Sequence, residues 1–227
     1  MKNHSMVNIS PLYTTDFSTN DHYLNLDANN NSSFDGSGTV WKDLSAQGND
    51  GTISGATWNS DGYFIFDGTN DVVTIDSTLL PATPEAYTAW VYPIPPPAGS
   101  FTNNPDYPIF GNSNDTSQYI IWTGNNLSVN GYNFPLQIVY NQWSHIHISN
   151  NFTNQMLLNH NGGNTVAGGS TYFSSAASAG IIVGDYNEIG AKTAGATPMY
   201  FDGYISKVRQ LQSWTYADLP RLYNEGP

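Results

Sequence analysis

The chain contains many short stretches in which apolar and polar residues alternate, with turn-forming residues between them. In Tyr23–Asp27, two leucines alternate with polar residues, which is the period of a β-strand with one buried face. Roughly a dozen such stretches follow one another at close spacing, and almost none has the period of a helix. Apolar strand faces of this kind are buried when two antiparallel sheets pack together. We therefore predict an all-β fold, a two-sheet antiparallel jelly-roll sandwich with a short C-terminal helical turn.

The length of 227 residues fits one large all-β domain. Residues 1–20 show no long periodic run, so we predict an N-terminal arm that is either loose or docked on a neighbouring protein. Residues 21–227 are predicted to form the jelly-roll domain. The proline-rich stretch that begins at Pro93 cannot continue a sheet, because proline has no N–H group to donate. We predict that residues 93–108 form an inserted loop rather than a linker, since strand patterns resume after them.

The charge of the chain is strongly negative: the formal net charge is −12, and only six residues are Lys or Arg. So few basic side chains do not readily form the basic patch that nucleic acid requires, and attraction to an anionic membrane is disfavoured for the same reason. Cations, including calcium, are the natural counter-charges. The chain has no cysteine, so its fold does not depend on the redox compartment.

The sequence has no stretch with the length and apolarity of a transmembrane helix, and its N-terminus lacks the pattern of a signal peptide. If the protein acts outside a cell, we expect it to leave the cell by a route that needs no signal peptide. Release by lysis, as part of a virus particle, is one such route.

Several short motifs follow one another along the chain in a fixed order. They are Leu26-Asp27-Ala28, residues 36–45 with Asn49-Asp50-Gly51, residues 66–73, Trp143-Ser144-His145-Ile146, Leu157-Leu158-Asn159, and residues 201–205 with Leu222-Tyr223-Asn224. Together they resemble, from about Tyr23 to Glu225, the laminin-G-like branch of the concanavalin A-like lectins and glucanases. The resemblance implies two curved sheets, one concave face and loops along a rim. It also implies binding of sugars or protein partners, often through calcium at the rim, although some members are glycosidases.

The residues of a glycosidase are missing from this pattern. The resemblance implies that a glucanase of this superfamily carries a strand with the pattern Glu-x-Asp-x-Glu, which places an acid and a nucleophile on one face. The three glutamates of this chain, Glu85, Glu188 and Glu225, stand far apart. The chain also has neither a cysteine nor a Gly-x-Ser-x-Gly motif for a nucleophile. We therefore predict a protein that is not an enzyme.

Two histidines two residues apart, His145 and His147, are predicted to face the same way from one strand. With a third ligand they would suit zinc. The alternative, which we prefer, is that His145 is a structural histidine packed by Trp143 and that His147 is its neighbour.

Acidic and amide side chains gather at two similar turns. Asp67, Asn70 and Asp71 fall on one tight turn, and Asp202 lies in a similar Phe-Asp-Gly motif near the end. Calcium prefers oxygen ligands of this kind, so these four residues form a candidate calcium site. The alternative is that Asp67 and Asp202 cap turns before glycine residues.

A sugar site needs an aromatic platform beside amide or acid groups. Trp41, Trp90 and Trp143 fall within strand patterns and are predicted to belong to the core. Tyr132 and Tyr186 are further aromatic candidates. The predicted ligand-binding residues are Tyr107, Asn112, Asn114, Tyr119, Trp122, Asn125 and Asn126.

These patterns predict a non-catalytic recognition or adhesion module that binds a glycan or a protein partner. The predicted setting is a virion surface, for example that of a phage, where the protein would decorate a capsid or form part of a tail or fibre. The N-terminal arm would contact other virion proteins, and the protein could form homo-oligomers. One alternative is a purely structural cement or oligomerisation protein. The other is a glycoside hydrolase or lyase.

Overall fold

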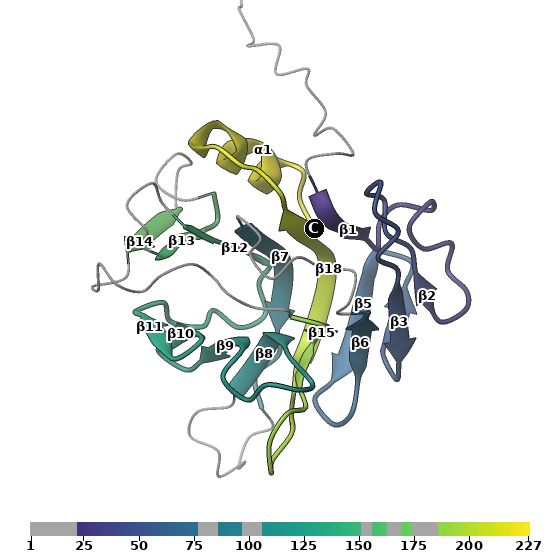
Figure 1. The fold of residues 1–227 in the computed structure, drawn as a ribbon, viewed down its shortest axis with the longest axis horizontal. Helices are drawn as coiled ribbons and strands as arrows, with labels where there is room; N and C mark the ends of the chain where they lie inside the picture. The colour runs from purple at the N-terminus through teal and green to yellow at the C-terminus, as the bar shows by residue number, and fades with distance from the viewer. Residues whose placement is uncertain (1–21, 77–85, 97–105, 151–155, 163–168, 174–185) are drawn as a thin grey trace, which may run out of the picture.

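The computed structural model describes residues 22–76, 86–96, 106–150, 156–162, 169–173 and 186–227. The predicted arm at residues 1–20, and residues 97–105 of the predicted proline-rich insertion, lie outside this part. The described residues form two eight-stranded antiparallel sheets, a two-stranded hairpin and one short α-helix. The predicted all-β, two-sheet fold is thus confirmed (Figure 1).

The first sheet is built around β18 (Asp202–Leu211), the ten-residue strand near the end of the chain. Its first half pairs with β5 (Tyr63–Asp67) and its second half with β1 (His22–Asp27). Along its other edge it pairs with β7 (Ala86–Pro93). The sheet continues from β7 through β12 (Ser144–Asn150) and β13 (Met156–His160) to β14 (Ser170–Phe173), and from β5 to β4 (Thr57–Asn59).

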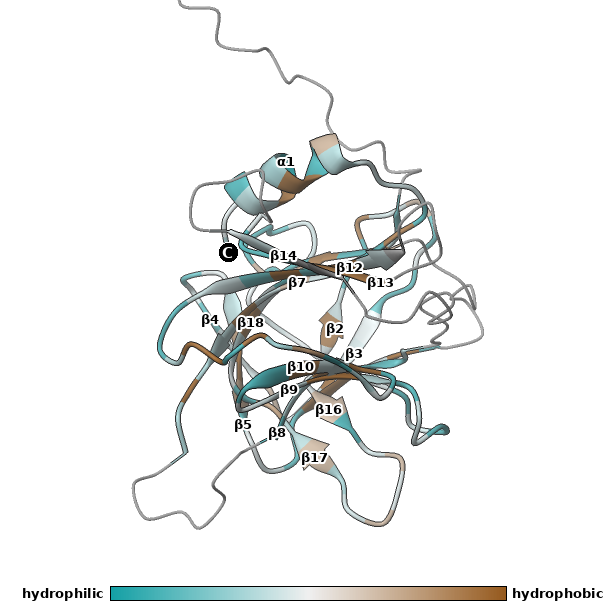
Figure 2. Cartoon of the chain, turned by 90° about the vertical axis from the view of Figure 1, so that its left-hand side faces the viewer, coloured by the Kyte–Doolittle hydropathy of each residue, from teal (hydrophilic) through white to brown (hydrophobic). Residues whose placement is uncertain are grey.

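The second sheet lies under the first, and the hairpin lies beyond it (Figure 2). In spatial order it contains β11 (Tyr132–Phe134), β10 (Asn126–Val129), β9 (Tyr119–Thr123), β8 (Asp106–Gly111), β15 (Glu188–Ile189), β6 (Val72–Ile75), β3 (Gly51–Ser54) and β2 (Val40–Trp41). The hairpin pairs β16 (Ala191–Lys192) with β17 (Met199–Tyr200).

The core fills the space between the two sheets with large side chains. Trp41 of the second sheet contacts Phe64 of the first, with ring centroids 4.6 Å apart. Tyr87 and Phe110 make a similar contact at 5.4 Å. All four rings are buried, and full burial of an apolar side chain of this size contributes about 1.5–3 kcal/mol.

A C-terminal cap, defined here as residues 212–227, covers part of the outer face of the first sheet (Figure 2). It contains a 3₁₀ turn (Tyr216–Asp218) and the helix α1 (Leu219–Asn224), as predicted for this end of the chain. Leu222 is buried against Leu211 and Ala86, and Glu225 forms an ion pair with Arg209 of β18 at 2.5 Å. Among the described residues, no helix has the length and apolarity needed to cross a membrane.

The end of the predicted inserted loop at residues 93–108 is wrong. Residues 106–108 belong to β8, and Pro108 lies at a point where the β8–β9 register shifts and its missing N–H is tolerated. Residues 136–140 alternate like a strand but form none, because Leu136 and Ile138 bury their side chains without joining a sheet. The turn at residues 68–71 leads from β5 in one sheet to β6 in the other.

Candidate functional site

Four aromatic residues gather on the outer face of the first sheet, at the end away from the C-terminal cap. They are Tyr63 of β5, Tyr92 of β7, Tyr204 of β18 and Trp143, which directly precedes β12; we call them the aromatic cluster. Tyr204 lies directly opposite Tyr92 in the strand register. Because side chains alternate along a strand, the buried residues next to each tyrosine point into the core and the tyrosines point outward.

The rings of the aromatic cluster contact one another closely. Tyr204 stacks on Tyr63 at 4.7 Å and on Tyr92 at 5.0 Å, with interplanar angles of 27° and 24°. Trp143 meets Tyr63 and Tyr92 edge to face at 5.8 and 5.5 Å. Such contacts hold the rings in fixed orientations. All four are only half-buried, so the cluster presents an ordered aromatic surface to solvent.

A glycine in β18 makes this arrangement possible. Gly203 precedes Tyr204 and has φ of +145°. A Cβ atom at this position would lie 2.1 Å from the carbonyl oxygen of Tyr92, which no side chain can tolerate. The sequence Asp202-Gly203-Tyr204 therefore lets β18 approach β7 closely enough for the two tyrosines to stack.

Carboxylates border the aromatic cluster. Asp202 lies directly opposite Asp67 on the neighbouring strand, two positions along from the pair formed by Tyr204 and Ile65. Burial raises the pKa of Asp202, and the charge of Asp67 raises it further. Asp61 lies near the other end, where partial burial raises the pKa of Tyr63 and the charges of Tyr204 and Asp61 add to the effect.

The structure places all four predicted calcium ligands near one turn, with Asp202 opposite Asp67, but not as a cation cage. Asp71 is buried and accepts a hydrogen bond from the backbone N–H of Asp67 at 2.9 Å. Asp67 in turn accepts one from the N–H of Thr69 at 2.8 Å, and Asn70 is exposed in the same turn. Within the described ranges, no three acidic or histidine side chains converge on one metal position. These contacts match the turn-capping alternative, and calcium stays a prediction.

Two of the predicted sugar-binding rings belong to the core, which is a correction. Tyr107 and Trp122 face each other on β8 and β9, and their exposed fractions are 1% and 0%. The Tyr107 hydroxyl donates to the carbonyl of Ile94, and the Trp122 indole N–H donates to the carbonyl of Leu136 at 2.8 Å. Neither ring is available to a ligand at the surface.

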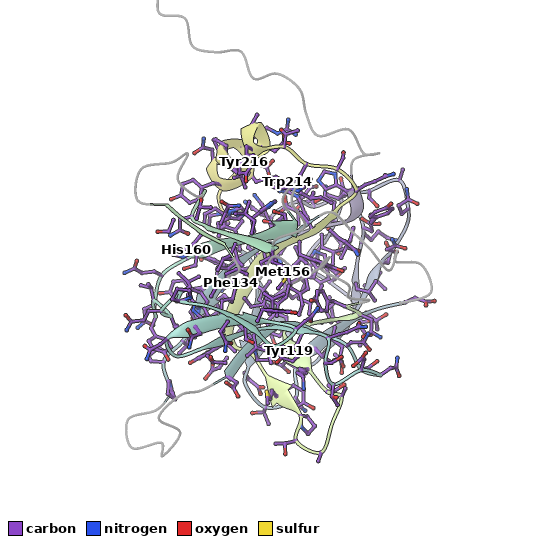
Figure 3. The ribbon with its side chains drawn as sticks, turned by 60° about the vertical axis from the view of Figure 1, so that its left-hand side comes forward. Tyr119, Phe134, Met156, His160, Trp214 and Tyr216 are labelled. Carbon is purple, nitrogen blue, oxygen red and sulfur yellow. The ribbon has the colours of Figure 1, made fainter. Side chains whose placement is uncertain are left out.

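The other predicted ligand-binding residues lie at opposite ends of β9. Buried Asn112 organises a turn, because its Oδ1 atom accepts the N–H group of exposed Asn114 at 2.7 Å. Half-buried Tyr119 lies on the second sheet, with the Lys192 ammonium 5.3 Å from its ring centre (Figure 3). Asn125 and Asn126 follow the far end of β9, and Asn126 pairs with Thr123. Thr123 is four residues from Tyr119, which is roughly 13 Å at about 3.3 Å per residue. These side chains do not form one site.

The two further aromatic candidates also differ from each other. Tyr132 is 40% exposed on β11, whereas Tyr186 is buried and donates a hydrogen bond to Asn130 at 2.9 Å. Figure 3 places Phe134 and Met156 between the sheets below the cap residues Trp214 and Tyr216. This end of the sandwich is therefore filled by side chains.

The histidine pair is structural, as preferred from the sequence, but its packing differs. His145 contacts the ring of Trp90 at 5.1 Å and the hydroxyl of Thr88 at 2.6 Å, and His147 contacts Trp214 at 4.7 Å. Burial lowers the pKa of His145 well below its usual value and that of His147 to about 3, so both are neutral near pH 7. Trp41 belongs to the core as predicted, Trp90 is buried on the outer face of the first sheet beneath Tyr223 of the cap, and Trp143 belongs to the surface cluster.

A separate pocket of about 300 Å³ opens in the loop before β2. Its lining shares no residue with the aromatic cluster and consists mainly of short polar side chains. Asp35 accepts the Ser37 hydroxyl at 2.9 Å, and Lys42 pairs with Asp50 at 3.2 Å. The charged groups of the pocket thus already have partners, and the aromatic cluster is the stronger candidate. The pocket is lined by residues 31–35, 37–40 and 42.

Sequence reasoning missed the aromatic cluster because its members come from four separate segments. A signal was nevertheless present: in Tyr63-Phe64-Ile65-Phe66, large residues occupy both faces of one strand. Aromatic residues on both faces of a strand indicate that its outer face is either covered by another part of the protein or binds a ligand.

No protein-family model matches the chain, and no curated protein matches it. Solved structures do match. Domain 4 of AbnA, a GH43 extracellular arabinanase from Geobacillus stearothermophilus in complex with arabinotriose, is 16% identical with a TM-score of 0.58, over 89% of this chain and 98% of that domain. The botulinum neurotoxin serotype D binding domain is 15% identical with a TM-score of 0.56, over 92% of this chain and 53% of that chain.

The binding domain of botulinum neurotoxin DC in complex with SialylT is 13% identical, with a TM-score of 0.58, over 91% of this chain and 52% of that one. The chain therefore spans about half the length of the neurotoxin binding domains and nearly all of the arabinanase domain. At these identities the likeness establishes the β-sandwich fold. The finer resemblance to laminin-G-like domains stays a prediction.

Proposed function

We propose that this protein is a non-catalytic glycan-binding module and that the aromatic cluster is its sugar-contacting surface. The observation that carries the proposal is the set of four half-buried rings, held by mutual contacts across neighbouring strands and bordered by carboxylates. A purely structural module is expected to show a flat apolar patch instead.

The chemistry of the aromatic cluster suits a sugar. The C–H groups of a pyranose or furanose ring pack against aromatic surfaces, while its hydroxyls need acceptors and donors nearby. Asp67 and Asp202 supply acceptors, and the tyrosine hydroxyls supply both. The rings are already fixed by stacking, so little side-chain ordering opposes binding.

The structural neighbours give the proposal independent support. The arabinanase domain, matched over 98% of its length, is in complex with arabinotriose, and the neurotoxin binding domain, matched over about half of its length, is in complex with SialylT. The absence of catalysis is part of the proposal. Glu188, for example, is buried and accepts the N–H of Thr193 at 2.9 Å, an arrangement that removes it from solvent. The virion setting stays a prediction from the sequence.

Isothermal titration calorimetry against arabino-oligosaccharides and a panel of other oligosaccharides tests the proposal. The Tyr204→Ala variant removes the central ring of the cluster and is expected to weaken binding roughly tenfold or more. Tyr132→Ala is the matched control, since it removes an exposed tyrosine from the other sheet. Thermal melting verifies that both variants fold. Equal loss in both variants, or no binding by the wild type to any glycan, contradicts the proposal. Parallel titrations with calcium and with a chelator test the predicted ion.

A further inference from the structure

We infer that the aromatic cluster selects neutral glycans and discriminates against glycans that carry carboxylate or sulfate groups. The inference rests on the proposed function and concerns the charge of the ligand at the same site. The supporting observations are that acidic side chains lie around the rings and that the described basic side chains have their contacts elsewhere.

Acidic side chains lie at both ends of the aromatic cluster. Asp67 and Asp202 are directly opposite each other on adjacent strands, a placement in which like charges repel. A Cβ atom added at Gly68 would lie 3.0 Å from the Cβ atom of Asp202, so the turn that follows Asp67 lies against the Asp202 side chain. Asp61 acts electrostatically on the hydroxyl of Tyr63 at the other end.

In the part of the chain that the structure describes, none of these three aspartates takes part in an ion pair. The described basic side chains have their contacts elsewhere. Lys42 pairs with Asp50, and Lys192 lies over Tyr119. Lys207 donates to the backbone carbonyls of Glu225 and Gly226, and Arg209 pairs with Glu225. Arg221 belongs to the cap helix.

An anionic sugar on this surface meets uncompensated negative charge without a cation to balance it. Its carboxylate would lose water on binding and gain only repulsion. A neutral sugar loses nothing comparable, because its hydroxyls donate hydrogen bonds to the same aspartates. The net charge of −12 adds a repulsive long-range field for anionic ligands.

The test uses pairs of glycans that share one backbone, such as a neutral oligosaccharide and its sialylated and sulfated forms. Each glycan is titrated at about 20 mM salt, where charges are weakly screened, and at about 300 mM salt, where they are strongly screened. We expect each acidic form to bind roughly tenfold more weakly than its neutral partner at low salt, and the gap to narrow at high salt. Asp202→Asn is expected to narrow the gap as well. Asp115→Asn, which removes the same charge from the β8–β9 loop, is expected to leave it unchanged.

The outcomes separate the two proposals. Acidic glycans that bind as tightly as their neutral partners, or more tightly, overturn this inference and leave the glycan-binding function standing. A gap that Asp202→Asn and Asp115→Asn change equally also overturns it, since the effect is then one of net charge alone. Failure of every glycan to bind overturns the proposed function and the inference together.

Discussion

The outer face of the first sheet has two aromatic regions with different fates. At one end, Trp90 stacks on Tyr223 and His147 contacts Trp214, both supplied by the C-terminal cap. At the other end, the ring contacts of the aromatic cluster that the structure describes join its own four members, and the rings stay half-exposed. The capped region thus contributes burial to stability, whereas the open region leaves aromatic surface exposed, where we propose that a glycan binds. The chain is therefore able to cover aromatic rings on this face of the sheet, as the cap does, and yet it leaves the aromatic cluster exposed.

The largest expected effect comes from loosening the cap. Leu222 is fully buried against Leu211 and Ala86, so Leu222→Ala is expected to lower the free energy of unfolding by about 2–5 kcal/mol, measured by urea denaturation. Glycan affinity of the folded variant should stay within about twofold, a change below 0.5 kcal/mol. If affinity falls as much as stability does, the two regions are not independent.

Acid should act on the capped region next. The folded-state pKa of His147 is about 3, against about 6.5 in the unfolded chain. The unfolded chain therefore binds more protons between these values, so stability is full above pH 6.5 and falls as the pH decreases toward 3. His147 alone is expected to remove about 2 kcal/mol at pH 5, measured by denaturation across the pH range. The His147→Leu variant should show a shallower pH dependence; an unchanged slope contradicts the assignment.

Removing the open region's indole should affect binding more than stability. Trp143 is half-buried, and Trp143→Ala is expected to weaken glycan binding roughly tenfold, or 1.4 kcal/mol. The loss of folding stability should be about 1 kcal/mol, because only ring contacts are removed. Calorimetry and thermal melting give the two numbers. A variant that binds normally but melts much earlier shows that Trp143 is a packing residue.

Calcium should have the smallest effect. In the described ranges, Asp67, Asp71 and Asp202 do not converge on one position as three ligands of a metal ion. We therefore expect added calcium or a chelator to change the melting temperature by less than about 3 °C, which is the shift that 1 kcal/mol produces in a domain of this size. A larger rise with calcium that Asp71→Asn abolishes would restore the predicted site.

The two-sheet fold was predictable because strand alternation is a local property of the sequence. Tyr23–Asp27, for instance, became β1 with every second residue buried, as its pattern indicates. Short strands such as β3 and β4 are hard to recognise, since three or four residues carry too little periodic signal. β14 is hard to recognise as well, because it lies in a stretch rich in Gly, Ser and Ala, a composition typical of loops.

The candidate site was much less predictable than the fold. Tyr107 and Trp122 match the composition of a sugar platform, but whether a ring points inward depends on the register of β8 and β9, which the sequence does not reveal. The aromatic cluster depends on the pairing of β18 with β5 and β7, strands far apart in the chain. Three separate tyrosines become one surface only after that pairing is known.

The most direct test of the account is a titration with a neutral oligosaccharide followed by the indole N–H signals in an NMR spectrum. Five of the six tryptophans report on these regions: Trp143 on the open region, Trp90 and Trp214 on the capped region, and Trp41 and Trp122 on the core. The account predicts that the Trp143 signal shifts in a saturable way while those of Trp90 and Trp214 stay in place. Saturable shifts at Trp214 with none at Trp143 would contradict it, because the ligand would then occupy a different face.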